Sequence, residues 1–184
     1  MISRDTLLSH GRRTELAKGQ HPCAIILGCA DSRVPAEIVF DQGLGDLFVI
    51  RVAGNIVAPS QIGSVEFAAA RFGVRLVAVV GHSNCGAIAA TIEELQQPSS
   101  GQSQNLRSIV DRVRPAVEPL LKTELAHDPE ALMREAVRAN VRVAANHLRH
   151  GSAILENLIL NDGLRVVGGE YSLESGAVDF FDGV

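Results

Sequence analysis

Four short, almost uninterrupted runs of apolar residues constrain the fold of this chain most strongly. Strands that are buried on both faces of a parallel sheet have such continuous apolar sequences, whereas strands with one solvent-exposed face alternate apolar and polar residues. Helical patterns separate the runs, as they do in βαβ units. We therefore predict an α/β fold with a mostly parallel central sheet of four to five strands and flanking helices. The runs are Ala24–Gly28, Asp46–Val52, Leu76–Gly81 and Leu164–Gly168.

Helix signals are clearest in the second half of the chain. Asp128 followed by Pro129 is a typical N-cap and first-turn pair, and Gly151 marks the end of the long helix that they begin. Ser152 is the predicted cap of a shorter helix that follows. In the first half, residues 61–72 place apolar side chains at helical spacing, which predicts a helix between the second and third strands.

Two further segments carry local structure signals. Residues 105–125 predict a helix that is interrupted at Pro115 and Pro119, because proline lacks the N–H that a helix needs. Residues 171–181 predict a β-hairpin with its turn at 174–176.

Length, charge and cysteine content narrow the function classes. The 184 residues suit one domain over residues 1–184, and the polar segment 96–104 predicts an exposed loop within it. The formal net charge of −4 gives no electrostatic footprint for nucleic acid and argues against an anionic membrane partner. No apolar run is long enough to span a membrane, and residues 1–13 contain no signal-peptide core. Three cysteines do not suggest a disulfide framework, so we expect a cytoplasmic protein with free thiols.

Two clusters of chemistry-bearing residues follow the first and third apolar runs. One contains Cys29, and the other contains His82 and Cys85. The carboxyl ends of parallel strands share one edge of a sheet, where ligands bind at the point where strand order reverses. Two thiolates and an imidazole suit Zn²⁺, and three protein ligands leave the fourth coordination position open, as in catalytic zinc sites. The sequence therefore predicts a zinc site at this edge.

An acidic and a basic residue stand next to the first proposed ligand. An arginine fork can hold a carboxylate with two hydrogen bonds, so Arg33 is expected to hold Asp31 ionised and away from the metal. Water would then occupy the open position. If the pair broke, Asp31 could become a fourth ligand and close the site.

These motifs resemble those of the β-class carbonic anhydrases. The two metal motifs are Cys-x-Asp-Ser-Arg over residues 29–33 and His-x-x-Cys-Gly over residues 82–86. The likeness also includes Lys18-Gly19-Gln20, SRVPAE from Ser32 to Glu37, GDLFVIRVAGN from Gly45 to Asn55, and the segment Val166–Tyr171. It runs from about residue 18 to residue 86 and again from 157 to 178, which is more than half of the chain.

The resemblance implies roles for particular residues. Cys29, His82 and Cys85 would be the zinc ligands, and Asp31 and Arg33 the catalytic dyad. Further residues would line a small substrate pocket, partly across a dimer interface, so we expect a homodimer or homotetramer. These pocket residues are Gln20, Phe48 and Phe67.

Some family members also bind an inhibitory bicarbonate. Arg51 stands where those members contact this anion. Ile26 stands where they carry a tryptophan, which argues against such inhibition in this chain.

The expected activity is the zinc-dependent, reversible hydration of carbon dioxide to bicarbonate and a proton, by attack of zinc-bound hydroxide on CO₂. Hydrolysis of COS or CS₂ on the same scaffold is an alternative. These residues do not distinguish it from CO₂ hydration, but relative rates on the three substrates would distinguish them. A non-catalytic zinc module, in which the metal only stabilises the fold, is a second alternative. The Asp31–Arg33 pair argues against it. A redox role for Cys29 and Cys85 is disfavoured because they lack Cys-x-x-Cys spacing.

Overall fold

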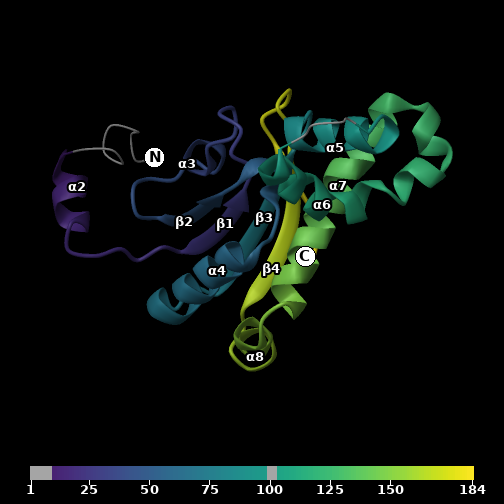
Figure 1. The fold of residues 1–184 in the computed structure, drawn as a ribbon. Coiled ribbons are helices and arrows are strands. Elements are labelled where there is room, and N and C mark those ends of the chain that lie inside the picture. Colours follow the sequence, from purple (N-terminus) through teal and green to yellow (C-terminus); the bar gives the residue numbers. More distant parts are fainter. Residues whose placement is uncertain (1–9, 99–102) are drawn as a thin grey trace.

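The computed structural model describes residues 10–98 and 103–184. Its five-stranded sheet has the order β2-β1-β3-β4-β5, and the first four strands in this order are parallel (Figure 1). β5 is antiparallel to β4 and completes the predicted hairpin. The predicted α/β fold with a mostly parallel sheet is thus confirmed. The strands are β1 (Ala24–Gly28), β2 (Leu47–Arg51), β3 (Leu76–His82), β4 (Arg165–Tyr171) and β5 (Val178–Asp182).

Helices connect the strands and follow the predicted caps where these exist. The Asp128 side chain accepts hydrogen bonds from the backbone N–H groups of Glu130 and Ala131, and Ser152 accepts one from Leu155. The α-helices are α2 (His10–Leu16), α3 (Ala36–Val39), α4 (Pro59–Phe72), α5 (Gly86–Gln96), α6 (Gln104–Val117), α7 (Pro129–His150) and α8 (Ala153–Asn161). The described part of the chain also contains the short 3₁₀ turns η1 (Ala53–Asn55), η2 (Leu120–Lys122) and η3 (Glu124–His127).

One predicted helix break is wrong and three helices were not predicted. Pro115 lies inside α6, close to its end, where the missing N–H removes a single helical hydrogen bond. α6 ends at Val117, two residues before Pro119, as predicted for that proline. The unpredicted helices are α2, α3 and α5. The predicted loop at 96–104 and the N-terminal segment 1–13 lie partly outside the described residues.

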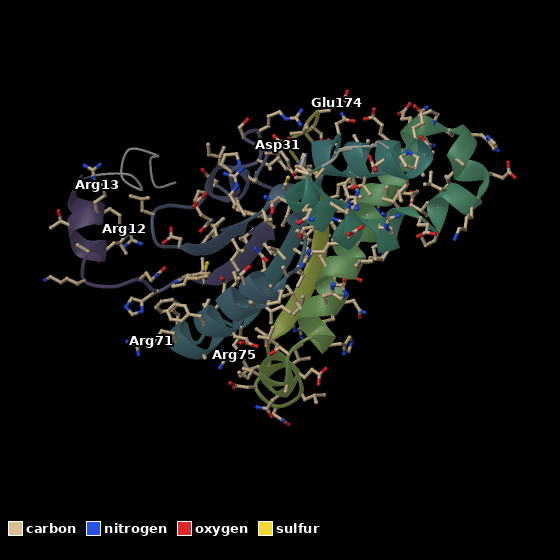
Figure 2. All side chains as sticks on the ribbon, in the orientation of Figure 1. Arg12, Arg13, Asp31, Arg71, Arg75 and Glu174 are labelled. Atoms are coloured by element: carbon tan, nitrogen blue, oxygen red, sulfur yellow. The ribbon has the colours of Figure 1, made fainter. Side chains whose placement is uncertain are left out.

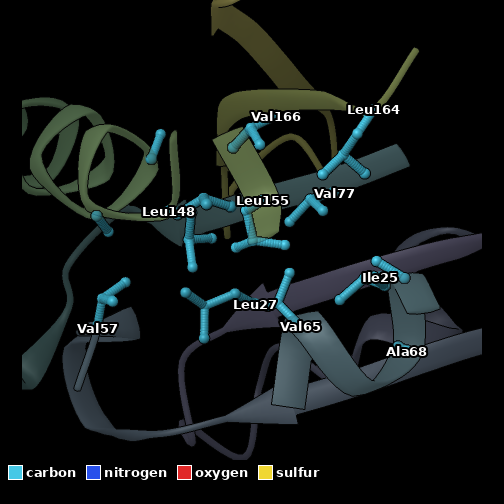
Figure 3. Packing of buried hydrophobic residues seen from close by; sticks show 14 of the residues in the cluster. Ile25, Leu27, Val57, Val65, Ala68, Val77, Leu148, Leu155, Leu164 and Val166 are labelled. Carbon is cyan, nitrogen blue, oxygen red and sulfur yellow. The ribbon is translucent and has the colours of Figure 1, made fainter. Parts of the chain in front are cut away.

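The main core fills the space between one face of the sheet and the layer formed by α4, α7 and α8 (Figure 3). Alternate strand residues point to this face because side chains in a strand alternate sides. Ile25 and Leu27 of β1 meet Val65 of α4 and Leu148 of α7 in this layer. The opposite face carries a smaller cluster that includes Ile26 and packs under α3.

A third cluster lies at the carboxyl ends of β1 and β3. It packs Cys29 and Cys85 against Ile88 of α5, Val113 of α6 and Val137 of α7. This cluster gives the predicted ligands an apolar, water-poor surrounding. Among the described residues, no helix combines the length and the apolar character needed to cross a bilayer.

Candidate metal centre

The site lies where strand order reverses. β1 and β3 are neighbours in the sheet, but the chain continues from β1 toward one edge and from β3 toward the other. This divergence opens a crevice at the carboxyl ends of the two strands. Figure 2 shows Asp31 at this end, together with Glu174 of the β4–β5 hairpin, while Arg75 lies at the opposite end.

Three potential metal ligands converge in the crevice. One nitrogen of His82 and the sulfurs of Cys29 and Cys85 all lie within 4.8 Å of one another, and all three side chains are buried. The two sulfurs are 3.9 Å apart. A tetrahedral ion with metal–sulfur bonds of about 2.3 Å holds two sulfurs about 3.8 Å apart. The observed spacing therefore fits a zinc ion between them.

The imidazole of His82 is oriented for metal binding. Its Nδ1 lies 2.9 Å from the Ser83 carbonyl oxygen, and an oxygen acceptor there fixes the proton on Nδ1. Nε2 is buried and has no hydrogen-bond partner among the described residues. A buried nitrogen lone pair without a partner is costly in an apolar site unless it binds a ligand. Zinc would satisfy it.

The loop between His82 and Cys85 is held in place by hydrogen bonds to Tyr171 and Leu173. Ser83 donates its backbone N–H to the Tyr171 carbonyl at 3.0 Å, and its Oγ accepts from the Leu173 N–H at 3.0 Å. Asn84 has a φ of 55°, a left-handed conformation that asparagine tolerates. Cys85 is the N-cap residue of α5, where the backbone N–H groups of Ala87 and Ile88 partly offset the rise that Cys29 and burial cause in its pKa.

Asp31 and Arg33 form the predicted fork. Arg33 Nε donates to Asp31 Oδ1 at 2.9 Å, and Nη2 donates to Oδ2 at 2.6 Å. The Arg33 backbone N–H also donates to Oδ1, at 2.9 Å. Asp31 Oδ2 lies 3.8 Å from His82 Nε2, so the carboxylate borders the centre while its oxygens are engaged by Arg33. Both carboxylate oxygens of Asp31 thus accept hydrogen bonds from Arg33, as the sequence predicts for this pair.

The contacts within the site favour a negative charge on Asp31 and on Cys29. Hydrogen bonds from Arg33 hold the pKa of Asp31 well below its usual range. The hydrogen bond between the two sulfurs lowers the pKa of Cys29 and, together with burial, raises the pKa of Cys85. Burial opposes the charged form of His82, but the Cys29 sulfur and the Ser83 carbonyl outweigh it and raise the pKa of His82. Metal binding would replace these shared protons, because a zinc site needs thiolates and a neutral imidazole.

Two further groups support the Cys29 loop. Gly54, in η1, donates its backbone N–H to the Cys29 sulfur at 3.4 Å. Arg51 donates Nε to the Cys29 carbonyl at 2.9 Å and Nη2 to the Asp31 carbonyl. Arg51 is expected near the site only from the family resemblance, and Gly54 and Ser83 are not predicted to support it. No local pattern marks Arg51, Gly54 or Ser83, because each of them contacts a residue that is distant in the sequence.

The three predicted pocket residues, Gln20, Phe48 and Phe67, are not among the residues that contact the three candidate ligands. Phe48 of β2 and Phe67 of α4 gather with Phe72, with ring centroids 5.6–6.3 Å apart. Phe67 is 53% exposed. Gln20 is half-buried in the segment between α2 and β1. Cys23 is exposed just before β1, at the end of the strand opposite to Cys29, and so lies outside the site.

Comparison with known proteins decides the family. The sequence profile of the carbonic anhydrase family matches residues 24–178. The chain is 40% identical over 168 residues to a carbonic anhydrase of Mycolicibacterium smegmatis, an alignment covering 91% of this chain and 79% of that protein. It is also 40% identical over 164 residues to carbonic anhydrase 2 of Mycobacterium tuberculosis, covering 89% and 76%.

Solved structures place the chain within one class of that family. The chain superposes with a TM-score of 0.81 and 26% identity on a tetrameric β-carbonic anhydrase of the ascomycete Sordaria macrospora, covering 92% of this chain and 85% of that one. The β-carbonic anhydrase CafA of Aspergillus fumigatus gives 0.82 and 27%, covering 94% and 81%. The chain belongs to the β-class carbonic anhydrase family. The predicted family, enzyme class, carbonic anhydrase activity and zinc cofactor are confirmed.

Proposed function

We propose that this carbonic anhydrase works with Cys29, His82 and Cys85 as zinc ligands and with Asp31 and Arg33 as the pair beside the open position. The observation that carries the proposal is the convergence of three ligand atoms within 4.8 Å beside an intact Asp31–Arg33 fork. When bound, zinc supplies a Lewis acid that makes water a nucleophile for carbon dioxide near neutral pH.

The residues of the chain divide the remaining work. Arg33 keeps Asp31 ionised, so that its carboxylate can accept a hydrogen bond from the attacking water and orient a lone pair toward the carbon of CO₂. The fork also keeps Asp31 from occupying the fourth position itself. The apolar cluster around Ile88 and Val113 limits competing water from behind the ligands. Bicarbonate and a proton leave, and the proton passes to buffer.

Three variants test these assignments by stopped-flow CO₂ hydration together with metal analysis. Asp31→Asn keeps zinc and loses about 10²-fold or more in kcat, because general acid–base and orienting groups contribute on that scale. Cys29→Ser loses both zinc and turnover. Cys23→Ser, an exposed thiol before β1, is the matched control and retains both. Full activity in Asp31→Asn, or no zinc-dependent rate in the natural chain, contradicts the proposal.

We further propose that the chain acts as a homodimer or homotetramer in the cytoplasm, with Gln20, Phe48 and Phe67 lining the substrate pocket across an interface. Three observations support this: the exposure of Phe67, the tetrameric relative from Sordaria, and the free state of all three cysteines. Sedimentation velocity tests it. A monomer with full activity at micromolar concentration contradicts it, whereas a lower mass and lower activity in Phe67→Asp support it.

A further inference from the structure

A buried amide in α7 reaches toward the metal centre without touching it. Asn140 is 2% exposed and lies one helical turn from Ala136 and from Ala144, on the apolar face of the helix. A polar group buried on such a face is costly unless it makes a hydrogen bond. Its Nδ2 donates to the Gly54 carbonyl oxygen at 2.7 Å, a contact between residues 86 positions apart.

Gly54 links this amide to a zinc ligand. Its carbonyl accepts from Asn140, and its own N–H donates to the Cys29 sulfur at 3.4 Å. The residue has a φ of +70°, which favours glycine, and a Cβ there would lie 3.1 Å from the Cβ of Ala87. Glycine has the widest backbone freedom of any residue, so the bond to its carbonyl restrains the direction in which its N–H points.

We propose that Asn140 is a positioning residue for the metal centre, which holds the Gly54 carbonyl so that the Gly54 N–H is aimed at the Cys29 sulfur. The inference rests on the proposed role of Cys29 as a zinc ligand. An N–H donated to a thiolate spreads its charge and fixes the direction of its lone pairs, and such outer contacts tune metal affinity. α7 therefore supports the centre although it contributes no ligand.

The test uses the full chain loaded with ¹¹³Cd, a spin-active stand-in for zinc. In the natural chain, NMR should detect scalar coupling between the metal and the Gly54 amide proton, because coupling passes through an N–H···S hydrogen bond. Asn140→Leu, which removes the donor at similar volume, should lose this coupling. It should also bind zinc about 10-fold to 100-fold more weakly in competition with a chelator.

A matched control separates positioning from general stability. Leu148→Ala opens a cavity in the same helix at a fully buried site of the main core, away from Gly54, and should keep the coupling and the zinc affinity. Asn140→Asp is a second variant, since it replaces the amide donor by an acceptor of nearly the same shape, and the same loss is expected.

The outcomes distinguish the two proposals. If the natural chain binds no cadmium through Cys29, the proposed function fails. If cadmium binds there without coupling to Gly54, only the role of Asn140 is overturned, whether or not the variants fold. The role is also overturned if either Asn140 variant keeps the coupling and an affinity equal to that of Leu148→Ala.

Discussion

At the scale of single residues, the protonation of Glu170 depends on its burial and on the charged groups around it. Glu170 of β4 lies 3.5 Å from Arg138, which also pairs with Asp179 at 2.8 Å and covers the ring of Phe181. Burial raises the pKa of Glu170, and Arg138 only partly offsets this. The charges of Asp179 and Glu135 add to the rise. The folded protein therefore holds a proton on Glu170 above the pH at which the unfolded chain releases it.

This asymmetry predicts a pH-dependent stability. Between the unfolded pKa and the raised folded pKa, the folded state binds more protons, so the contribution of Glu170 to stability falls as pH rises. Glu170→Gln lacks this dependence. The unfolding free energy of the variant minus that of the natural chain should increase from pH 4.5 upward and then level off. Urea denaturation across pH measures it, with the exposed Glu174→Gln as control, and a difference that stays flat or decreases contradicts the account.

At the scale of elements, α7 packs close to the sheet because β3 and β4 each have a glycine where they face this helix. A Cβ on Gly81 of β3 would lie 2.7 Å from Val141, and a Cβ on Gly168 of β4 would also lie 2.7 Å from Val141. Val141 is fully buried in the main core. The distance of α7 from the sheet, and hence the reach of Asn140, depends on these two small residues.

The contact predicts a coupled pair of substitutions. Gly81→Ala overpacks the interface and should cost about 1–3 kcal/mol of unfolding free energy. Val141→Ala alone should also destabilise, through a cavity. Because the new methyl group would fill that cavity, the double variant should be more stable than the sum of the two effects by about 1 kcal/mol or more. Urea denaturation of all four proteins measures the coupling, and simple additivity would refute the close approach.

At the scale of the whole molecule, the metal centre joins segments that are far apart in the chain. Cys29 follows β1, whereas His82 is the last residue of β3 and Cys85 is the N-cap of α5. The fork adds a direct link between the two loops, since Arg33 Nη2 also donates to the Asn84 carbonyl at 3.4 Å. A metal bound there stabilises the folded state alone, because the unfolded chain does not hold the three ligands together.

Metal removal should therefore lower stability. Free zinc at a hundredfold excess over its Kd adds about 2.7 kcal/mol to the unfolding free energy, and stripping with a chelator removes it. Thermal unfolding with and without zinc checks this. Cys23→Ser should respond as the natural chain does, whereas Cys85→Ser should lose the response. Equal melting temperatures for the loaded and stripped natural chain contradict a metal that bridges the two loops.

The sequence by itself determined the strands, the caps that begin α7 and α8, and the candidate ligand set. These follow from local causes: buried parallel strands are apolar throughout, Asp128 and Ser152 cap through their own side chains, and thiolate and imidazole donors suit zinc. The helix α5 was not predicted because its N-cap residue, Cys85, makes no side-chain hydrogen bond that would mark the helix start. The predicted helix break at Pro115 was wrong because a proline near a helix end removes only one hydrogen bond.

Only the tertiary structure decided which groups support the ligands. The strand order places Cys29 beside His82, the Arg33 fork holds the Asp31 carboxylate, and the close approach of α7 brings Asn140 to Gly54. These contacts join backbone atoms and side chains across dozens of residues. Their partners are chosen by packing, which no local pattern of residues encodes.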